Sequence, residues 1–326
     1  MIVMNQIINM NYSIIIPFYN EEKNIESLNS ELNLVLNNIK DPKKNFEIIY
    51  VDDGSYDNTF EELKLTIKNK IKTIIAKHEF NYSQSSAIIT GISISNYENL
   101  IFLDGDMQND PADIPKMLEF YENGYDMVSG WRKKRKDNFF MRTLPSILAN
   151  FCVRLFSKSK LNDHGCALKI LKKKIINYKI SWGDFHRLLA ARISFDNWKV
   201  KEIEVNHRER KSGKSKYNLN RVFRILIDLI YMNMFKIGGQ RSIYFFGKFG
   251  LWSFFASLLS FIYMIYKKIF QEVYLHQTPL PILVFLFLFM GFLFLFIGLL
   301  SQLILSTKED KISNEIHIKD KIENNL

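Results

Sequence analysis

The sequence predicts an α/β fold, in which a mainly parallel sheet is covered by helices on both faces and followed by a hairpin of two membrane-spanning helices. Strand-like and helix-like segments alternate from residue 12 to residue 130, an alternation that is typical of parallel sheets. Polar loops follow the strand-like segments, and from Ile243 onward the chain changes into long apolar runs. These three observations define the predicted architecture.

Five segments are predicted as strands, and the segments between them as helices. The strands are 12–16, 46–51, 71–76, 99–103 and 125–130. Ser83 is placed to cap the helix after the third strand, and Pro111 suits the first turn of the helix after the fourth. Ligands of such sheets bind at the carboxyl ends of the strands. We therefore expect three polar loops, PFYNEE, DDGSYDN and DGDMQND, to gather at one edge.

Two later segments are long and apolar enough to cross a bilayer, which takes about 20 apolar residues. The first runs from about Phe249 to Tyr266, and it reaches back to Ile243 if Lys248 snorkels to the membrane surface. The second, 279–305, carries no charge. The short link between them predicts a helical hairpin with both flanks on the same side. The alternative is a hairpin buried in a protein core.

The net charge of +10 is concentrated in three stretches, 131–136, 171–174 and 207–216. Such patches fit an anionic membrane surface or a phosphorylated ligand. Nucleic acid is the weaker interpretation because it leaves the hairpin and the aspartate-rich loop at 104–110 unexplained. The two cysteines are too few for a disulfide framework or a cysteine-based metal site.

The flanks of the hairpin predict its orientation. We expect no signal peptide before the first strand, because residues 1–13 lack a basic start and a long apolar core. Basic residues outside the hairpin outweigh Lys267 and Lys268 in the link, which favours a cytoplasmic location for both flanks. The predicted organisation is an α/β domain over 1–218, a helical region over 219–242, two transmembrane helices over 243–306 and a mobile cytoplasmic tail over 307–326. The region 219–242 fits an interfacial helix or a domain-capping helix equally well.

The segment IFLDGDMQNDP, residues 101–111, ends a predicted strand in a cluster of carboxylates. Asp104 and Asp106 are separated by one glycine, so in an extended segment their side chains point the same way. Two neighbouring carboxylates favour a divalent cation, and oxygen ligands suit Mg²⁺ or Mn²⁺. Gln108 adds a neutral oxygen. The alternative is a cluster of turn-forming or helix-capping side chains.

The other two loops offer groups that suit a nucleotide. A carboxylate at Asp52 or Asp53 can accept hydrogen bonds from a nucleobase N–H or a ribose hydroxyl, and Tyr19 and Glu21 are expected beside it. Together with a cation that binds a diphosphate, these groups indicate a nucleotide-sugar site. Neither GxxxxGK[ST] nor GxGxxG occurs in the sequence, so a P-loop or a dinucleotide-binding fingerprint is not expected.

Five segments resemble glycosyltransferase family 2, whose members have the GT-A fold. They are IIPFYNEEKNI, IIYVDDGSYDNT, NYSQSSAIITGI, FLDGDMQNDP and VNHRERKSGKSKYNL. The order and spacing agree over about residues 12–230. With the hairpin, the resemblance narrows to the polyisoprenyl-phosphate glycosyltransferases, the group of dolichyl-phosphate mannose synthase. It implies a membrane-bound, metal-dependent enzyme that moves a sugar from a UDP- or GDP-sugar to a polyprenyl phosphate.

The resemblance also implies roles for individual residues. Contacts to the nucleotide sugar fall on Pro17, Tyr19, Glu21, Asp52 or Asp53, Gln84 and Asp104. Metal ligands fall on Asp104, Asp106 and Gln108. Catalytic groups fall on Asp106 and, around the acceptor phosphate, on Arg132, Arg142, Ser146 and Lys216. Stretches 163–169 and 183–189 match family segments near the acceptor, where Asp184 and His186 are candidates. Ser83 and Asp184 depart from the family pattern, which has Gly and Glu there.

A lipid phosphate is ionised at pH 7, so its attack needs charge balance and positioning rather than a strong base, and in-line attack inverts the anomeric carbon. Two alternatives remain. A hydroxyl acceptor would need a base, for which Asp184 is the candidate, and a membrane-anchored module could bind nucleotide sugars without catalysis. Structural hydrogen bonding is the preferred role of His164, His186 and His207. Hairpin anchors are also compatible with a homo-oligomer.

Overall fold

The computed structural model describes residues 10–68, 70–133, 153–154, 159–176, 189–190, 193, 198–209, 242–271, 274, 278–307 and 318–324. The chain divides into two compact units. The first unit comprises Met1–Leu229 and Asn314–Leu326, and the second comprises Ile230–Ser313.

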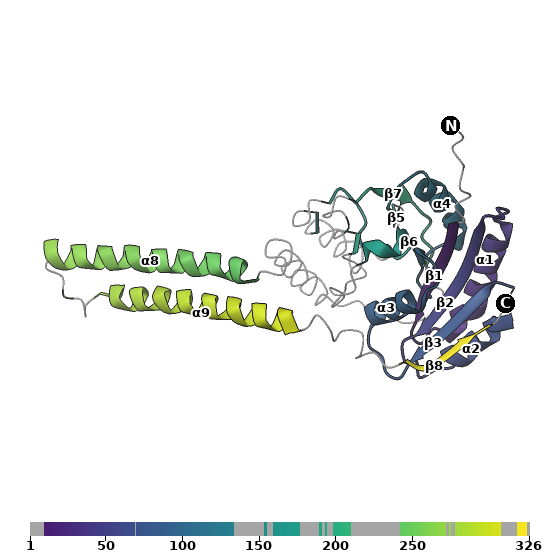
Figure 1. The fold of residues 1–326 in the computed structure, drawn as a ribbon, viewed down its shortest axis with the longest axis horizontal. Coiled ribbons are helices and arrows are strands. Elements are labelled where there is room, and N and C mark those ends of the chain that lie inside the picture. Colours follow the sequence, from purple (N-terminus) through teal and green to yellow (C-terminus); the bar gives the residue numbers. More distant parts are fainter. Residues whose placement is uncertain are drawn as a thin grey trace, which may run out of the picture. The chain divides into compact units, whose positions relative to one another are not determined.

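The first unit is built on an eight-stranded sheet of order β7-β5-β6-β4-β1-β2-β3-β8 (Figure 1). Its strands are β1 Met10–Phe18, β2 Lys44–Asp52, β3 Lys72–His78, β4 Asn99–Phe102, β5 Met127–Trp131, β6 Lys169–Lys172, β7 Val200–Glu204 and β8 Ile318–Glu323. The strand pairings show that β6 and β8 run opposite to the other six. The prediction of a mainly parallel sheet is confirmed.

Helices cover both faces of this sheet. They are α1 Ile25–Asn38, α2 Thr59–Leu65, α3 Gln84–Ile94 and α4 Ile114–Glu122, with short 3₁₀ turns at Glu22–Asn24, Thr66–Lys68, Pro111–Asp113 and Lys173–Ile175. On one face, Leu28 of α1, Leu63 of α2 and Met117 of α4 are buried in a common apolar core. On the other face, Ala87 and Ile92 of α3 belong to a second core. The alternating strands and helices expected from the sequence therefore form a three-layer domain.

Two local predictions are confirmed at the helix starts. The Ser83 hydroxyl accepts a hydrogen bond from the backbone N–H of Ser86 and caps α3. Pro111 begins the 3₁₀ turn that leads into α4, where a missing N–H costs nothing because the first N–H groups of a helix have no intrahelical partner. Three strands, β6, β7 and β8, were not among those expected from the sequence.

The strand β8 differs from the mobile tail predicted for 307–326. It pairs antiparallel with β3, from Ile74 opposite Glu323 to His78 opposite Ile318. Without it, β3 would be a sheet edge with unpaired N–H and C=O groups. Only Ile322 of this strand packs against the apolar core, so backbone pairing and side-chain hydrogen bonds hold the segment in place.

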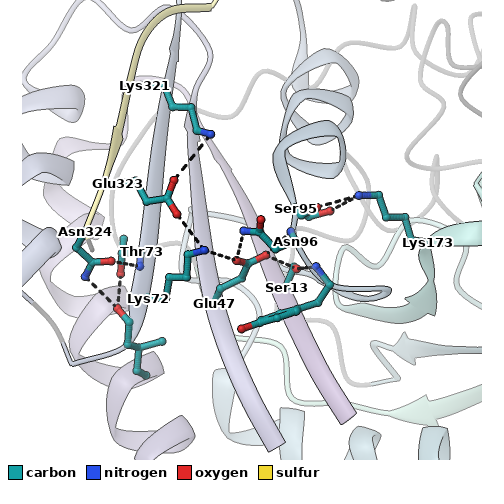
Figure 2. A network of polar contacts seen from close by, with 12 residues as sticks. Ser13, Glu47, Lys72, Thr73, Ser95, Asn96, Lys173, Lys321, Glu323 and Asn324 are labelled. Carbon is teal, nitrogen blue, oxygen red and sulfur yellow. Dashed lines mark hydrogen bonds and ion pairs between the residues drawn. The ribbon is translucent and has the colours of Figure 1, made fainter. Parts of the chain in front are cut away.

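Figure 2 shows the polar contacts that fix the end of β8. The Asn324 side chain accepts a hydrogen bond from Thr73 N at 2.6 Å and donates to Ile67 O at 3.1 Å. Lys72 Nζ lies 2.9 Å from Glu323 Oε1 and 3.8 Å from Glu47 Oε2. Glu47 is fully buried and accepts further hydrogen bonds from Ser13 and Asn96. The last described residues thus connect to a buried network at the amino ends of β1, β2 and β3.

The second unit contains two long apolar helices, α8 Ser242–Phe270 and α9 Leu280–Thr307. Contacts between Gly250 and Leu295 and between Ser257 and Val284 run in opposite directions along the helices, so the pair is antiparallel. A Cβ at Gly250 would lie 3.1 Å from Gly291 O, which shows how closely the backbones approach. The predicted two-helix hairpin is confirmed.

Both helices have the length and composition of a membrane span, over Ile243–Phe270 and Leu280–Ile304. Only 11% of each apolar window is buried within the protein. A hairpin in a protein core would be mostly buried, so this exposure argues against that alternative. The helical region predicted over 219–242 lies outside the described residues, apart from Ser242 at the start of α8.

Candidate functional site

The loops after β1 and β2 are joined by hydrogen bonds at the carboxyl edge of the sheet. Register places Phe18 at the end of β1 opposite Asp52 at the end of β2. Asn20 N donates to Ser55 Oγ at 2.9 Å, and Asn20 Oδ1 accepts from Tyr56 N at 3.1 Å. The prediction that these loops gather at one edge is confirmed, and Asn20 holds them together in a left-handed conformation with φ 54°.

Two candidate nucleotide contacts, Tyr19 and Glu21, lie in this joined pair of loops. The Tyr19 ring packs edge-on against Tyr56, with ring centroids 6.0 Å apart, and Tyr56 is largely exposed. Glu21 donates its backbone N–H to Thr59 Oγ1 at 3.0 Å, and its carboxylate accepts from Asn24 Nδ2. The structure therefore offers an exposed aromatic surface beside an anchored carboxylate.

The neighbouring aspartates Asp52 and Asp53 have different surroundings. Asp53 accepts hydrogen bonds from Tyr82 N at 3.0 Å and Ser83 N at 2.9 Å, and its Oδ1 lies 2.8 Å from His78 Nδ1. Asp52 is buried, accepts one hydrogen bond from Ser55 N at 3.0 Å, and its Oδ2 has no partner among the described residues. Burial raises the pKa of Asp52. Asp53 thus organises the loop before α3, and Asp52 alone retains an acceptor for a ligand.

Ser83, which departs from the family pattern, stands in a backbone conformation that glycine favours. Its φ of 127° and ψ of 159° lie in a region that side chains with a Cβ rarely adopt. Two hydrogen bonds hold this conformation. The Ser83 N–H donates to the Asp53 carboxylate, and the Ser83 Oγ accepts from Ser86 N at the start of α3. A glycine, which the resemblance led us to expect here, would adopt this conformation without strain.

The loop after β4 approaches the loop after β1 through Gly105. A Cβ at Gly105 would lie 2.6 Å from the Phe18 ring and 3.0 Å from Pro17 O. Asp104, Asp106 and Gln108 are half-exposed, whereas the residues between them are buried. Exposure therefore alternates along the loop, but the extended geometry assumed for it is wrong, because the backbone turns here and Met107 has a left-handed φ of 62°.

Asp104 belongs to a small pocket. Gln84 Nε2 donates to Asp104 Oδ1 at 2.7 Å, and both side chains line a pocket with Pro17 and Lys169. The structure therefore brings together three of the predicted donor-site residues: Pro17 near the end of β1, Gln84 at the start of α3 and Asp104 after β4.

The third carboxylate of the cluster, Asp110, has a structural role. It caps the turn before α4 by accepting from Ala112 N at 3.0 Å, and it pairs with Arg208 at 2.7 Å. Arg208 also pairs with Glu31 of α1 at 2.6 Å. The interpretation as a capping cluster therefore holds for Asp110, and Asp104 and Asp106 remain as candidate metal ligands.

The donor set fits a hard divalent cation that keeps part of its shell for other oxygen ligands. Asp104 and Asp106 lie two residues apart on a half-exposed turn, and Asp106 Oδ1 accepts from Gln108 N at 3.1 Å. Within the described ranges, no cluster of three or more His, Cys, Asp or Glu side chains could hold a metal by itself. Two carboxylates and an amide suit Mg²⁺ or Mn²⁺ when phosphate oxygens and water complete the shell.

Arg132, the predicted acceptor contact that follows β5, forms a bidentate pair with Asp163. Its Nε and Nη2 donate to the two carboxylate oxygens at 2.8 and 3.0 Å. Asp163 is nearly fully buried, and its own N–H donates to Glu202 of β7 at 2.8 Å. A planar fork held in this way has a fixed orientation. Sequence reasoning placed Arg132 near the site but did not identify its partner.

Five predicted site residues lie outside the described residues: Arg142, Ser146, Asp184, His186 and Lys216. Two further histidines considered in the sequence analysis, His164 and His207, are described, and both are buried. Burial lowers the pKa of His164 to about 4, so this imidazole is neutral at pH 7. His207 forms a backbone bridge with Asn109, next to the aspartate cluster. Structural hydrogen bonding by these two side chains stays a prediction.

Lys169 is a feature that sequence reasoning did not single out. It begins β6, is only 2% exposed and lines the pocket of Gln84 and Asp104. In the sequence it precedes three further lysines, Lys172 to Lys174, and such a stretch resembles a basic surface. Only the pairing of β6 with β4 and β5 shows that this lysine points into the protein.

Comparison with known proteins agrees with this geometry. The family model for glycosyl transferase family 2 matches residues 13–178. The chain is 30% identical to dodecaprenyl-phosphate galacturonate synthase of Rhizobium johnstonii, over 93% of this chain and 91% of that protein. It is also 30% identical to undecaprenyl-phosphate 4-deoxy-4-formamido-L-arabinose transferase of Proteus mirabilis, over 90% of this chain and 87% of that protein.

Solved structures support the fold. Glucosyl-3-phosphoglycerate synthase of Mycobacterium tuberculosis, in complex with Mn²⁺, UDP-glucose and phosphoglyceric acid, superposes with a TM-score of 0.51 at 14% identity. The match covers 69% of this chain and 79% of that one. The domain is therefore a GT-A-like glycosyltransferase domain. The chain belongs to glycosyl transferase family 2, and it is an enzyme of the glycosyltransferase class.

Proposed function

We propose that the protein transfers a sugar from a nucleotide-sugar donor to a polyprenyl phosphate in the membrane and inverts the anomeric carbon. The observation that carries this proposal is the similarity to two polyprenyl-phosphate sugar transferases, which extends over 90% or more of the chain and so includes the apolar hairpin. The site geometry supports it, because Gln84 and Asp104 line one pocket next to the joined loops of Tyr19, Glu21 and Asp52.

The donor binds, in this proposal, along the carboxyl edge of the sheet. Asp52 has an acceptor for a nucleobase or ribose group, and Tyr19 offers its ring. Gln84 orients the Asp104 carboxylate through their 2.7 Å hydrogen bond. Asp104, Asp106 and Gln108 would hold Mg²⁺ or Mn²⁺, which when bound offsets the charge on the nucleoside diphosphate. Asp53, which sequence reasoning offered as an alternative contact, instead acts as a positioning residue for the loop.

The acceptor phosphate needs positive charge rather than a general base, because it is already ionised. Arg132, Arg142 and Lys216 are the proposed cationic contacts, and Ser146 is a proposed hydrogen-bond donor. Asp163 fixes the guanidinium plane of Arg132 before the acceptor arrives. The oxygen of the lipid phosphate forms the new bond to the anomeric carbon, and the bonding electrons of the old bond leave with the diphosphate.

The proposed location is a two-span membrane protein with its glycosyltransferase domain in the cytoplasm. Strand β8 follows the hairpin in sequence yet pairs with β3, which precedes the hairpin. A single sheet lies on one side of a membrane, so this pairing supports an even number of crossings between the two strands. The basic residues that flank the hairpin, Arg221, Arg224, Lys236, Arg241, Lys308 and Lys311, favour the cytoplasmic side.

The experiment is a transfer assay with full-length protein purified in detergent. Undecaprenyl phosphate is incubated with a panel of UDP- and GDP-sugars, with Mg²⁺, Mn²⁺ or EDTA, and lipid-linked sugar is measured by mass spectrometry. We expect metal-dependent transfer that falls about 100-fold or more in Asp106→Asn. An anomeric configuration that is retained in the product contradicts direct attack.

The same assay separates the alternatives. Transfer to a glycan hydroxyl and never to lipid phosphate contradicts the proposed acceptor, and loss of that activity in Asp184→Asn would point to a base-catalysed reaction. Binding of a nucleotide sugar without any transfer contradicts catalysis. Lipid transfer that is undiminished by EDTA contradicts the role given to Asp104, Asp106 and Gln108.

A further inference from the structure

Lys169 is a buried lysine in the interior of the sheet. It opens β6 opposite Phe102 of β4 and Ser129 of β5, and 2% of the residue is exposed. Directly opposite residues on neighbouring strands project from the same face, so Lys169 shares its face with Phe102, which packs in the core under α3. A lysine is almost never fully buried unless it is paired. Its position therefore calls for an anionic partner.

Among the residues that the structure describes, Lys169 has no carboxylate within ion-pairing distance. Its Nζ donates to the backbone carbonyl of Cys166, which uses one of the three donors that an ammonium group carries. The next lysines of the same segment are satisfied. Lys172 pairs with Asp126 at 2.7 Å. Lys173 donates to Ser95 O and Oγ at 2.9 and 3.0 Å, as Figure 2 shows. Lys169 thus differs from Lys172 and Lys173 in having a single backbone carbonyl as its described polar partner.

Lys169 reaches the pocket that holds the predicted donor-site residues. Pro17, Gln84 and Asp104 line this pocket together with Lys169. The Asp104 carboxylate belongs to the same lining, and Gln84 ties it in place at 2.7 Å. The pocket holds about one water-sized atom. That is the size of a single phosphate oxygen.

We propose that Lys169 binds a phosphate oxygen of the donor's diphosphate from the inner wall of this pocket. The proposal rests on the proposed function and adds a cationic residue to the donor side, which otherwise presents carboxylates and an amide. Lysine is a compact point charge and a frequent ligand of phosphates. As the bond between the anomeric carbon and the diphosphate breaks, the electron pair stays on the diphosphate, and Lys169 stabilises that charge without transferring a proton.

The test compares nucleotide affinity in matched variants of the full-length protein in detergent. Lys169→Met keeps the length of the side chain and removes its charge, Lys169→Arg restores a cation, and Lys172→Met is the control from the same strand. The probes are UDP and GDP, each with Mg²⁺, and the nucleosides uridine and guanosine, which lack the diphosphate. Dissociation constants are measured by calorimetry, and thermal unfolding is recorded for each variant.

We expect Lys169→Met to weaken binding of the nucleoside diphosphate by about tenfold or more. Affinity for the nucleoside should stay the same, and Lys169→Arg should recover part of the loss. A purely structural lysine would change the melting temperature and affect all ligands alike. If the Met variant does not yield folded protein, Lys169→Gln and Lys169→Arg make the same comparison between a neutral and a charged side chain.

The outcomes separate this inference from the proposed function. A wild-type enzyme that transfers sugar to lipid, with a Lys169→Met variant that keeps its affinity for UDP or GDP, overturns the role of Lys169 alone. A variant that changes only the KM for undecaprenyl phosphate overturns it too, because the cation would then serve the acceptor. A wild-type protein that binds neither UDP nor GDP overturns both.

Discussion

Asp53 and His78 form a fully buried pair in which Asp53 Oδ1 lies 2.8 Å from His78 Nδ1. The other ring nitrogen of His78 lies 2.8 Å from Thr90 Oγ1 on α3. The same carboxylate also accepts the N–H groups of Tyr82 and Ser83. The end of β3, the start of α3 and the loop between them are therefore held by a single aspartate.

The first prediction separates the two neighbouring aspartates. Asp53→Ala should lower the free energy of unfolding by about 3 kcal/mol, because it leaves the buried His78 ring and the N–H groups of Tyr82 and Ser83 without their partner. Asp52→Asn should leave the melting temperature nearly unchanged, since its amide oxygen can still accept from Ser55 N. We expect that variant to weaken nucleotide binding instead. Thermal unfolding and calorimetry with UDP and GDP measure both effects, and equal melting temperatures for the two variants would contradict the distinction.

The second prediction concerns the strained backbone at Ser83. Ser83→Gly should stabilise the protein by about 1 kcal/mol, because glycine adopts φ 127° without strain. Replacing serine by glycine as the N-cap costs only a few tenths of a kcal/mol. Ser83→Ala is the matched control. It keeps the strain and loses the cap, so it should destabilise by about 1 kcal/mol. Differential scanning fluorimetry measures the melting temperature of both variants. Shifts in the same direction would contradict the prediction.

The third prediction tests whether β8 is an integral part of the sheet. Asn324→Ala removes hydrogen bonds to Thr73 N and Ile67 O and should destabilise the first unit by about 1–3 kcal/mol. Lys321→Ala, an exposed position on the same strand, should change stability by less than about 0.5 kcal/mol. Hydrogen exchange of β3 amides gives a local measure. Unchanged protection of β3 in Asn324→Ala would mean that β8 does not cover it in solution.

The fourth prediction is a pH dependence caused by His164. Burial, together with the nearby charge of Lys169, lowers the pKa of His164 to about 4, from an unfolded value of 6.5. Between these values the unfolded chain binds more protons than the folded one, so stability falls as the pH decreases from about 6.5 to about 4. The loss attributable to this residue reaches about 3 kcal/mol at pH 4.

The His164 prediction is checked by thermal unfolding in detergent at a series of pH values. In His164→Gln the stability should depend less steeply on pH over this window, whereas above pH 7 the variant has no such advantage. Parallel curves for wild type and variant between pH 4 and 6.5 would contradict the assignment, because every other titrating group is common to both proteins.

The first five strands were predictable because each is an apolar run that ends in a polar loop. β6, β7 and β8 were not, since their sequences, KILK, VKEIE and IKDKIE, are short and rich in charge. They form because β4, β5 and β3 offer edges for pairing. Such pairing depends on residues far away in the chain, and local hydrophobic periodicity contains no information about it.

The candidate site was predictable to a similar extent. Asp104 and the loops after β1 and β2 could be placed because the carboxyl ends of parallel strands meet at one edge. The different roles of Asp52 and Asp53 depend on the contact between Asp53 and the His78 side chain. The orientation of Arg132 depends on Asp163, 31 residues later in the chain. The burial of Lys169 can be recognised only when the register of β6 with β4 and β5 is known. Side-chain partners of this kind follow from tertiary packing.

The position of β8 also orders the events of biosynthesis. Both apolar helices, α8 and α9, leave the ribosome before β8 does, so β3 remains an open strand while the hairpin enters the lipid. During this interval its bare backbone is a template on which other nascent chains can pair. In the proposed membrane location, β8 closes that edge only after the hairpin has inserted, so anchoring precedes completion of the domain.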